Sequence, residues 1–443
     1  MNSSALSKAL GVKLVTSSDM DFSIAKWRDM YMNKAEWIGE RVESIGLPSA
    51  ISSEFARMIM TEFRSEINDG YLNKQYQKFA EKLFTAVDIA CAMGGVLFKP
   101  YVSGDDILTD IVRPTDFFPV SFSNDVMTSV ICPETVTIGK DIFIRCEFHS
   151  YDNVKNTHTV HNLCFHSDMY ENIRSKCRLS DVPQWAGLKE YQVIENVDYP
   201  LFCYFKMPFS NNIDMKSPLG ISVFSKAETL IKQADRHWER ILWEFESSER
   251  AIDATEDIFR MKNGKPELPR GRERMFRTYS VGLDDASKPF IETFSPEIRD
   301  NSLFNGLNRI LQRIEFSCGL AYGTISDISA VEKTAEEIKT SKQRSYMNVC
   351  NIQKNLENAL RQLVYCYGVY SQHFGLAGKQ SEFTCTFGDS VLEDTEKEFQ
   401  RRLQMVNSGL LSKEHFISWY FGCSVEEAVK YLPQTSELFG GEL

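Results

Sequence analysis

The chain has 443 residues, of which 43% are hydrophobic and 25% are charged, and its formal net charge is −11. This length allows two or three domains with cores of their own, and the composition is that of an ordinary folded protein. Proteins that hold DNA tightly through its phosphates are usually basic, so any contact with nucleic acid is expected to be local or weak. No apolar run reaches the roughly 18 residues that a membrane span needs, so no membrane span is expected.

The eleven cysteines are spread along the chain without a CxxC pair or a regular spacing. The polar start at residues 1–4 does not read as a secretory leader. Together these features predict free thiols in a reducing compartment.

Residues 20–93 are predicted to be helical, because apolar side chains recur there at intervals of three or four. The first such group is Trp27, Met30, Tyr31, Trp37 and Ile38. Gly94 and Gly95 are expected to end the last of these helices, and a strand is expected at residues 96–101.

Residues 95–206 change to strand character. Alternating or apolar runs predict further strands at residues 107–112, 143–149, 157–165 and 201–205. These strands follow the helices instead of alternating with them. A mixed, mostly antiparallel β region in an α+β fold is therefore favoured over a doubly wound fold.

Two long helices are predicted around a small insert. The first begins at Val223 and is about 27 residues long, or roughly 40 Å. The second begins at Ser295, with Ser as the N-cap and Pro296 at the first helical position. The insert at residues 251–294 carries turn signals and expected strands near 278–281 and 290–294, so this part reads as a stalk with a tip.

The longest predicted helix starts near residues 331–338 and continues to Phe374 without a proline. Thr334 and Glu337 have the spacing of a capping box, in which each side chain pairs with a backbone N–H at the helix start. A helix of about 35–40 residues is roughly 50–60 Å long, so it must cross or join subdomains. Beyond it, a strand is expected at residues 382–387, and a helical tail with caps at Ser412 and at Ser424 with Glu427.

Catalytic signatures are scarce. Residues 375–379 lack the spacing of a P-loop, and neither a nucleophile elbow nor HExxH occurs. The one metal-like cluster is His158, His161, Cys164 and His166, residue types that zinc uses. Their spacing on a strand puts them on both faces, so a strand with surface histidines is the favoured interpretation, and no metal or cofactor is expected.

The insert contains a basic run at residues 260–277, although the whole chain is acidic. The cations of this run are Arg260, Lys262, Lys265, Arg270, Arg272, Arg274 and Arg277, against Glu267 and Glu273. This run is either a solvated surface loop or a docking surface for an acidic partner or DNA. The polar connection before Thr334 is likewise open to two interpretations, as a plain helix–helix loop or as a functional loop.

Four stretches, taken in order, resemble a known family. They are AMGGVLFKPY (92–101) followed by IVRPTDFFP (111–119); PLGIS (218–222) with the helix after it; CGLAYGTI (318–325) with EKTAEEI (332–338); and DSVLED (389–394) with VNSGL (406–410). The chain resembles the portal proteins of long-tailed, siphovirus-type bacteriophages, the family found in phages and prophages of Gram-positive bacteria. The ordered set of motifs, which covers nearly the whole chain, carries this resemblance.

The resemblance implies an α+β portal fold. Residues 1–220 would form an α/β wing, residues 221–250 and 296–321 a two-helix stem, and residues 251–295 a small β-containing clip. Residues 322–334 would form the tunnel loop. A long kinked tunnel helix with a wing strand (335–390) and a short helical crown (391–443) would complete the chain.

The resemblance also implies a non-enzymatic role in a ring, usually of twelve subunits, at one vertex of the capsid. Double-stranded DNA would be packaged and ejected through the ring, which would dock the terminase and then the head–tail adaptor, and would meet the major capsid and scaffold proteins. The ring would assemble in the host cytoplasm and reside in the virion, without a membrane. The implied channel residues are Thr324, Ser326, Asp327, Ser329 and Lys333, and the implied clip docking residues are Arg270, Arg272, Arg274 and Arg277.

Two alternatives belong to other classes of protein. One is another ring-forming head–tail connector or a minor capsid protein, which the long stalk and full length disfavour. The other is a metal-dependent hydrolase that would use His158, His161 and Cys164, and bound zinc in stoichiometric amount would favour it.

Overall fold

The computed structural model describes residues 3–168, 173–256, 259–262, 265–266, 275–279, 291–327, 335–388, 395–422 and 424–432. The chain divides into two compact units. The first contains Met1–Ile59 and Ser65–Cys385, and the second contains Met60–Arg64 and Thr386–Leu443. Among the described residues, every helix is too short or too polar to cross a membrane.

Five helices open the chain. They are α1 (Ser3–Leu10), α2 (Ser18–Tyr31), α3 (Leu47–Met60), α4 (Gly70–Ala80) and α5 (Leu83–Met93). Trp27 and Met30 of α2 are buried as their spacing predicts. The prediction that Trp37 continues this helical stripe is wrong, because α2 ends at Tyr31. Trp37 instead lies beyond the helix, where its indole N–H donates to Asp235 at 2.8 Å.

A three-stranded antiparallel sheet lies next to α5 and has the order β10-β2-β3. Its strands are β2 (Gly95–Ser103), β3 (Asp106–Val112) and β10 (Cys203–Lys206). Gly94 ends α5 in the left-handed region, with φ of 88°, as its place in the sequence predicts. A Cβ at Gly94 would lie 2.5 Å from the carbonyl oxygen of Gly220, so glycine allows two distant segments to touch here.

A second sheet has the order β4-β5-β6-β7-β8, with β9 also paired to β7. The strands are β4 (Phe118–Ser123), β5 (Val126–Ile138), β6 (Asp141–Asp152), β7 (Thr157–Ser167), β8 (Ile173–Cys177) and β9 (Tyr191–Glu195). The strand pairings in this sheet, over the residues that the structure describes, are antiparallel. Helices followed by antiparallel sheets confirm the expected α+β class, although β5 was not predicted.

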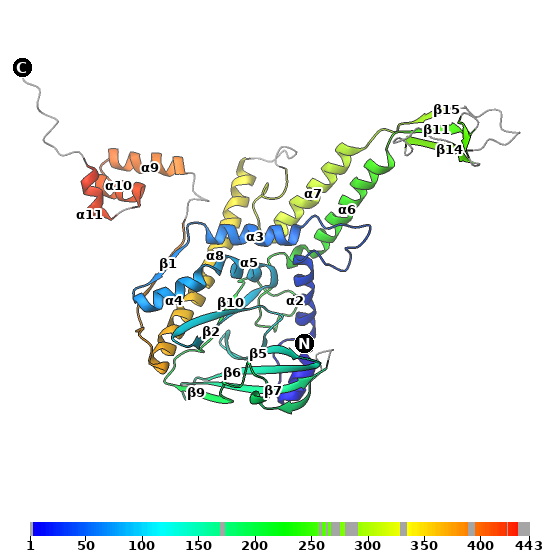
Figure 1. The fold of residues 1–443 in the computed structure, drawn as a ribbon. Helices are drawn as coiled ribbons and strands as arrows, with labels where there is room; N and C mark the ends of the chain where they lie inside the picture. Colours follow the sequence, from blue (N-terminus) through cyan, green and yellow to red (C-terminus); the bar gives the residue numbers. More distant parts are fainter. Residues whose placement is uncertain are drawn as a thin grey trace, which may run out of the picture. The chain divides into compact units, whose positions relative to one another are not determined.

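Two helices, α6 (Glu228–Ser247) and α7 (Asp300–Cys318), pack along each other, as Figure 1 shows. The expected start of the first at Val223 is wrong, because the backbone N–H of Val223 bonds to the carbonyl of Cys91 at 3.0 Å instead of opening a helix. The expected start of the second at Ser295 is also wrong. Arg299 is the N-cap, and its own N–H donates to Glu244 at 3.3 Å.

A small sheet lies at one end of α6 and α7 (Figure 1) and has the order β14-β11-β15. Strand β11 (Ala251–Thr255) pairs in parallel with β14 (Phe276–Tyr279) and antiparallel with β15 (Ile291–Phe294). A separate short pair joins β12 (Met261–Lys262) to β13 (Lys265–Pro266). The insert therefore contains strands near both predicted places, and β11 in addition.

Helix α8 (Ala335–Phe374) has 40 residues and confirms the predicted long helix. Its buried side chains include Ile352, Leu356 and Leu363, and it packs on β2 and β10. Thr334, the predicted cap, lies outside the described residues. Strands β1 (Arg64–Ile67) and β16 (Phe383–Thr386) form a two-stranded sheet.

The second unit contains α9 (Thr395–Asn407), α10 (Lys413–Phe421) and α11 (Val425–Ala428). Both predicted caps are confirmed: Ser412 accepts from the N–H of His415, and Ser424 with Glu427 forms a capping box. An aromatic cluster joins α9 to α10, with the rings of Phe399 and Phe416 5.5 Å apart between centroids.

Candidate functional site

The segment after α7 is held by one buried carboxylate. Glu315, in the last turn of α7, is completely buried. Its Oε1 accepts from the backbone N–H groups of Gly323 (3.1 Å), Ile325 (2.8 Å) and Ser326 (2.9 Å), and its Oε2 accepts from the Ser326 hydroxyl at 2.8 Å. A buried charge is tolerated only when it is hydrogen-bonded in this way, so Glu315 and the segment fix each other.

A second anchor lies two turns earlier on α7. Asn308 donates to the carbonyl of Asp327 at 3.1 Å and accepts from the N–H of Asp327 at 2.8 Å. On the other side, Ser341 of α8 accepts from the N–H of Tyr322 at 3.3 Å. Residues 322–327 are therefore bonded to both α7 and α8.

Three of the five predicted channel residues, Thr324, Ser326 and Asp327, fall in this segment. The Thr324 hydroxyl donates to the carbonyl of Ala321 at 2.6 Å, and the Ser326 hydroxyl donates to Glu315. Both hydroxyl groups therefore donate hydrogen bonds to other residues of the same chain. Asp327 is exposed. Ser329 and Lys333 lie outside the described residues.

A cavity of about 460 Å³ opens beside α7. It is lined by Leu230 of α6, by Arg309, Ile310, Gln312 and Arg313 of α7, and by Tyr322. Gln312 is 9% exposed, and its Nε2 is buried without a hydrogen-bond partner among the residues that the structure describes. Among the described residues, this lining contains the two arginines Arg309 and Arg313 and no carboxylate, whereas the Gln312 Nε2 atom is itself buried and does not face the cavity.

The tip sheet carries one described member of the predicted docking surface. Arg277 of β14 is exposed and donates to both carboxylate oxygens of Asp253, at 2.7 Å and 2.9 Å. Its guanidinium also lies over the ring of Phe294, 4.4 Å from the centroid. Arg277 therefore also holds β14, β11 and β15 together, whereas Arg270, Arg272 and Arg274 lie outside the described residues.

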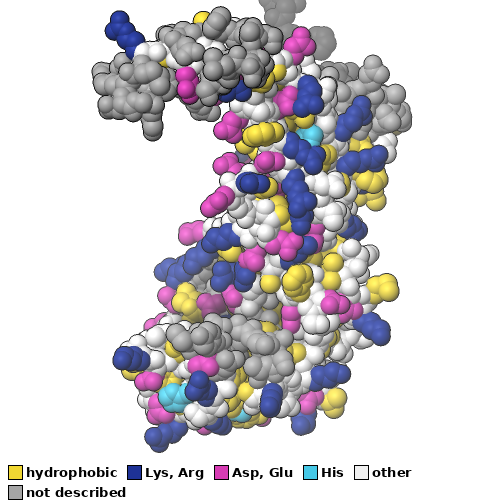
Figure 2. Space-filling model, turned by 90° about the vertical axis from the view of Figure 1, so that its right-hand side faces the viewer, with side chains coloured by type: hydrophobic (Ala, Val, Ile, Leu, Met, Phe, Trp, Pro, Cys, Tyr) yellow, Lys and Arg dark blue, Asp and Glu magenta, His cyan; other side chains and the backbone are white. Residues whose placement is uncertain are grey.

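Charges of both signs are interspersed on the face of the molecule that Figure 2 shows. Over the described residues visible in that view, basic side chains do not gather into one continuous patch. A broad electrostatic grip on DNA would need such a patch, so this face does not provide one.

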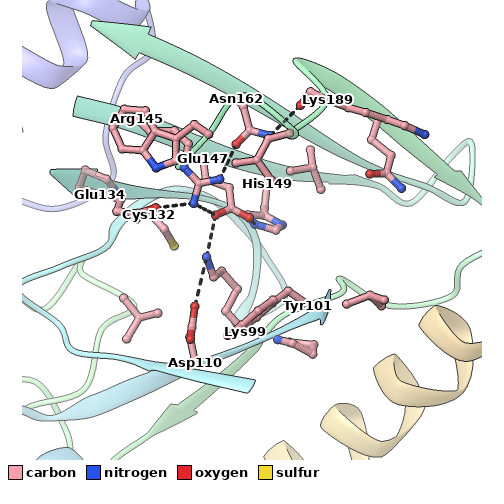
Figure 3. A pocket seen from close by; sticks show the side chains of 18 of the residues that line it. Lys99, Tyr101, Asp110, Cys132, Glu134, Arg145, Glu147, His149, Asn162 and Lys189 are labelled. Carbon is pink, nitrogen blue, oxygen red and sulfur yellow. Dashed lines mark hydrogen bonds and ion pairs between the residues drawn. The ribbon is translucent and has the colours of Figure 1, made fainter. Parts of the chain in front are cut away.

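A cavity of about 810 Å³ lies between the two sheets and contains buried charges (Figure 3). Lys99 of β2 donates to Glu147 of β6 at 2.6 Å and lies 3.6 Å from Asp110. Arg145 of β6 binds Glu147 at 3.2 Å and Glu134 at 2.6 Å. This chain of alternating charges joins β2 and β3 to the second sheet, so it serves to align the sheets.

The pKa values of this cluster follow from its pairing. Burial opposes the charged form of Glu147, but Lys99, His149 and Arg145 together outweigh it and hold the pKa of Glu147 well below its usual range. Burial likewise opposes the charge of Lys99, and Glu147 outweighs it, so the pKa of Lys99 is raised. The lowered pKa of Glu147 and the raised pKa of Lys99 therefore have the same cause, which is the attraction between these two opposite charges.

The four residues of the metal-like cluster do not share a site. His158 bonds to His149 at 3.1 Å, His161 packs on Tyr191, Cys164 lies opposite Cys177, and His166 packs on Phe143. Among the described residues, no group of three metal-ligating side chains converges.

The prediction of surface histidines is wrong for His158, which is completely buried. Burial, and then the nearby His149, lower the pKa of His158 well below its usual value.

Sequence reasoning missed Glu315 and Lys99 as organising residues. A signal existed for Glu315, which lies between Ile314 and Cys318 of the apolar stripe, so its position faces the protein interior. Lys99 stands in an apolar strand, and its partner Glu147 is far away in the sequence. Only the structure brings the two together.

Comparison with known protein families gives one match. The family model described as "Phage portal protein, SPP1 Gp6-like" matches residues 61–437. No curated protein matches the chain. The match covers α4 to α11, and thus both α6 and α7 with the tip sheet between them.

Proposed function

The chain belongs to the SPP1 Gp6-like family of phage portal proteins, and from this membership we propose that it forms the ring through which double-stranded DNA enters and leaves the capsid. The family is structural, so the protein acts by shape and contact instead of by catalysis. The expected ring has twelve subunits at one capsid vertex and is assembled in the host cytoplasm.

One structural observation supports this role above all: the α6 and α7 pair has two different ends. At one end is the sheet β14-β11-β15, and at the other α7 continues into the anchored segment 322–327 and then α8. We assign residues 221–250 and 296–321 to the stem, residues 251–295 to the clip and residues 322–334 to the tunnel loop. Residues 1–220 and 335–390 form the wing, and residues 391–443 form the crown.

The clip is proposed to dock the terminase during packaging and the head–tail adaptor afterwards. Support comes from the run of cations in residues 260–277 of an otherwise acidic chain. Arg270, Arg272 and Arg274 are proposed to meet these partners, with Arg277 both exposed and bound to Asp253. The wing is proposed to contact the major capsid and scaffold proteins.

The proposal is tested by complementation of a phage whose own copy of this gene is disrupted. Restored DNA-filled heads support the function, and empty heads with the intact protein present contradict it. Changing Arg270, Arg272 and Arg274 to Glu should spare the ring but impair packaging or tail joining.

A matched control reverses three exposed cations elsewhere, Lys13, Lys34 and Lys140. This control should leave the yield of infectious particles unchanged. Equal yields from the clip variant and the control would contradict the docking role.

A further inference from the structure

We propose that Cys164 of β7 and Cys177 of β8 are the site of a disulfide bond, which forms when the protein passes from a reducing to an oxidising environment. The two residues are Cα partners in the antiparallel pairing of β7 with β8, and both are free thiols in the structure. The change of environment rests on the proposed function, because a virion assembled in the host cytoplasm is released into an oxidising medium. The chemistry of the pair does not depend on that function.

The backbone geometry of the pair suits a disulfide. Residues directly opposite each other on antiparallel strands have Cα atoms about 4.5–5.5 Å apart, and their side chains lie on the same face of the sheet. Disulfides form at Cα separations of about 4.4–6.8 Å. Burial, and then a hydrogen bond to Cys177, raise the pKa of Cys164 to about 12, so the two thiols already lie within hydrogen-bonding distance.

The two thiols differ in their access to solvent. Cys164 is 2% exposed and packs in one cluster with Phe143, Val182 and Trp185. Cys177 is half-buried and is the last residue of β8. Cys177 is therefore the thiol that can meet a dissolved oxidant. Burial raises the pKa of Cys177, so its reactive thiolate is scarce at neutral pH and the reaction is slow.

The oxidant is a small dissolved disulfide such as oxidised glutathione. The Cys177 thiol loses its proton to water, and its sulfur attacks one sulfur of the oxidant, which forms a mixed disulfide and releases one glutathione thiolate. The Cys164 thiol then loses its proton, and its sulfur attacks the Cys177 sulfur and releases the second glutathione. The two cysteines are oxidised to one disulfide, and the two released thiolates take up the two protons.

The bond would fasten a strand that has little apolar packing of its own. Strand β8 ends the order β4-β5-β6-β7-β8, and its three middle side chains are exposed. The disulfide would close residues 165–176 into a covalent loop. Such a loop stabilises the folded state mainly because it restricts the unfolded chain. The edge of the sheet would therefore be more stable after oxidation than before it.

The test incubates the purified, reduced protein with oxidised glutathione, blocks the remaining thiols and maps the disulfides by mass spectrometry after digestion. We expect a peptide pair that is joined through Cys164 and Cys177. The thermal midpoint should rise by at least about 3 °C on oxidation. Cys177→Ser should abolish both the joined peptides and the rise.

A second cysteine pair serves as an internal control. The sulfur atoms of Cys203 and Cys366 are 4.0 Å apart, but both residues are completely buried. They should stay thiols, since no oxidant reaches them in the folded protein. The matched variant is Cys350→Ser, which removes another half-buried thiol. Its midpoint should rise on oxidation as that of the unchanged protein does.

Two results would overturn the disulfide site. One is that Cys164 and Cys177 both remain thiols after long incubation. The other is that Cys177 is trapped as a mixed disulfide with glutathione while Cys164 stays free. Both results come from the unchanged protein, so they do not depend on whether the Cys177→Ser variant folds.

A separate measurement tests the change of environment. Particles purified without reductant should contain the Cys164–Cys177 bond, whereas protein whose thiols are blocked inside intact host cells should not. Particles that keep both thiols contradict an oxidation in the released virion. A chain that never forms rings contradicts the proposed function itself, whereas rings in which the pair stays reduced contradict only this inference.

Discussion

Glu315 and Ser326 are joined twice, because the backbone N–H of Ser326 donates to Oε1 at 2.9 Å and its hydroxyl donates to Oε2 at 2.8 Å. With Gly323 and Ile325 as further donors, a single carboxylate sets the course of the chain after α7. This arrangement makes a clear prediction about the loop.

Glu315→Ala should release residues 323–326, because three backbone N–H groups and one hydroxyl lose their acceptor, while Ser341 and Asn308 still hold Tyr322 and Asp327. The expected cost is about 3 kcal/mol, since hydrogen bonds to a charged group contribute about 1.5–3 kcal/mol each and water replaces part of them. Hydrogen exchange should accelerate at Gly323, Ile325 and Ser326. Glu315→Gln is the control, because it keeps an acceptor oxygen and can donate to Ser326. Equal exchange in the Ala and Gln variants would contradict the anchoring role.

The Lys99–Glu147 pair should be sensitive to the loss of one partner. The side chains are 9% and 12% exposed, so removing one charge leaves the other in a poorly solvated site. Lys99→Met should therefore lower the free energy of unfolding by about 3 kcal/mol. Lys99→Met/Glu147→Gln should recover part of this loss, because no unpaired charge stays behind. Chemical denaturation measures both, and a double variant less stable than the single one would refute the explanation.

His158 predicts loss of stability in mild acid. Its folded-state pKa lies well below 6.5, so below about pH 6.5 the unfolded chain binds a proton there that the folded chain does not. The stability from neutral His158 is therefore complete above that pH and is lost as pH falls below it. Glu147 contributes little in this window, since its unfolded pKa is near 4.5 and its folded pKa is lower still.

The measurement is the thermal midpoint between pH 7.5 and 5.5. His158→Gln should lower the midpoint at pH 7.5 but flatten its decline toward pH 5.5. His166→Gln, on the same strand but partly exposed, should keep the slope of the unchanged protein. A slope unaffected by His158→Gln would show that another group controls the acid response.

Gly94 should be far less replaceable than Gly104, although both have positive φ. A Cβ at Gly104 meets no atom within 4 Å, so Gly104→Ala should cost only the backbone strain, about 1 kcal/mol. At Gly94 a Cβ would lie 2.5 Å from the Gly220 carbonyl oxygen, and backbone cannot move aside easily. Gly94→Ala should cost clearly more in the free energy of unfolding. Equal costs at the two positions would contradict the close contact.

The sequence predicted features that depend on local chemistry. Helix α8 follows from its apolar period and lack of proline, and Gly94, Gly319, Ser412 and Ser424 mark helix ends where their residue types place them. The α+β class followed from the order of helices and strands. The ordered motifs led to the portal family that the family match then confirmed.

Features that depend on distant partners could not be predicted in the same way. The start of α7 moved from Ser295 to Asp300, and the backbone N–H of Arg299 is taken by Glu244, a residue of another helix. His158 was expected at the surface because alternation along β7 does not reveal that Phe202, a residue of a later segment, packs against both His158 and His149. The cavity beside α7 is lined by residues of α6, of α7 and of the segment after α7. A periodic pattern within one segment cannot predict such a cavity.

The central claim is that this chain forms a portal ring, and the most direct test is the mass and symmetry of the purified protein. Mass photometry should give a particle of about twelve subunits, and class averages in negative stain should show a ring with a central hole. A monomer or dimer at every salt and protein concentration tested would contradict the claim.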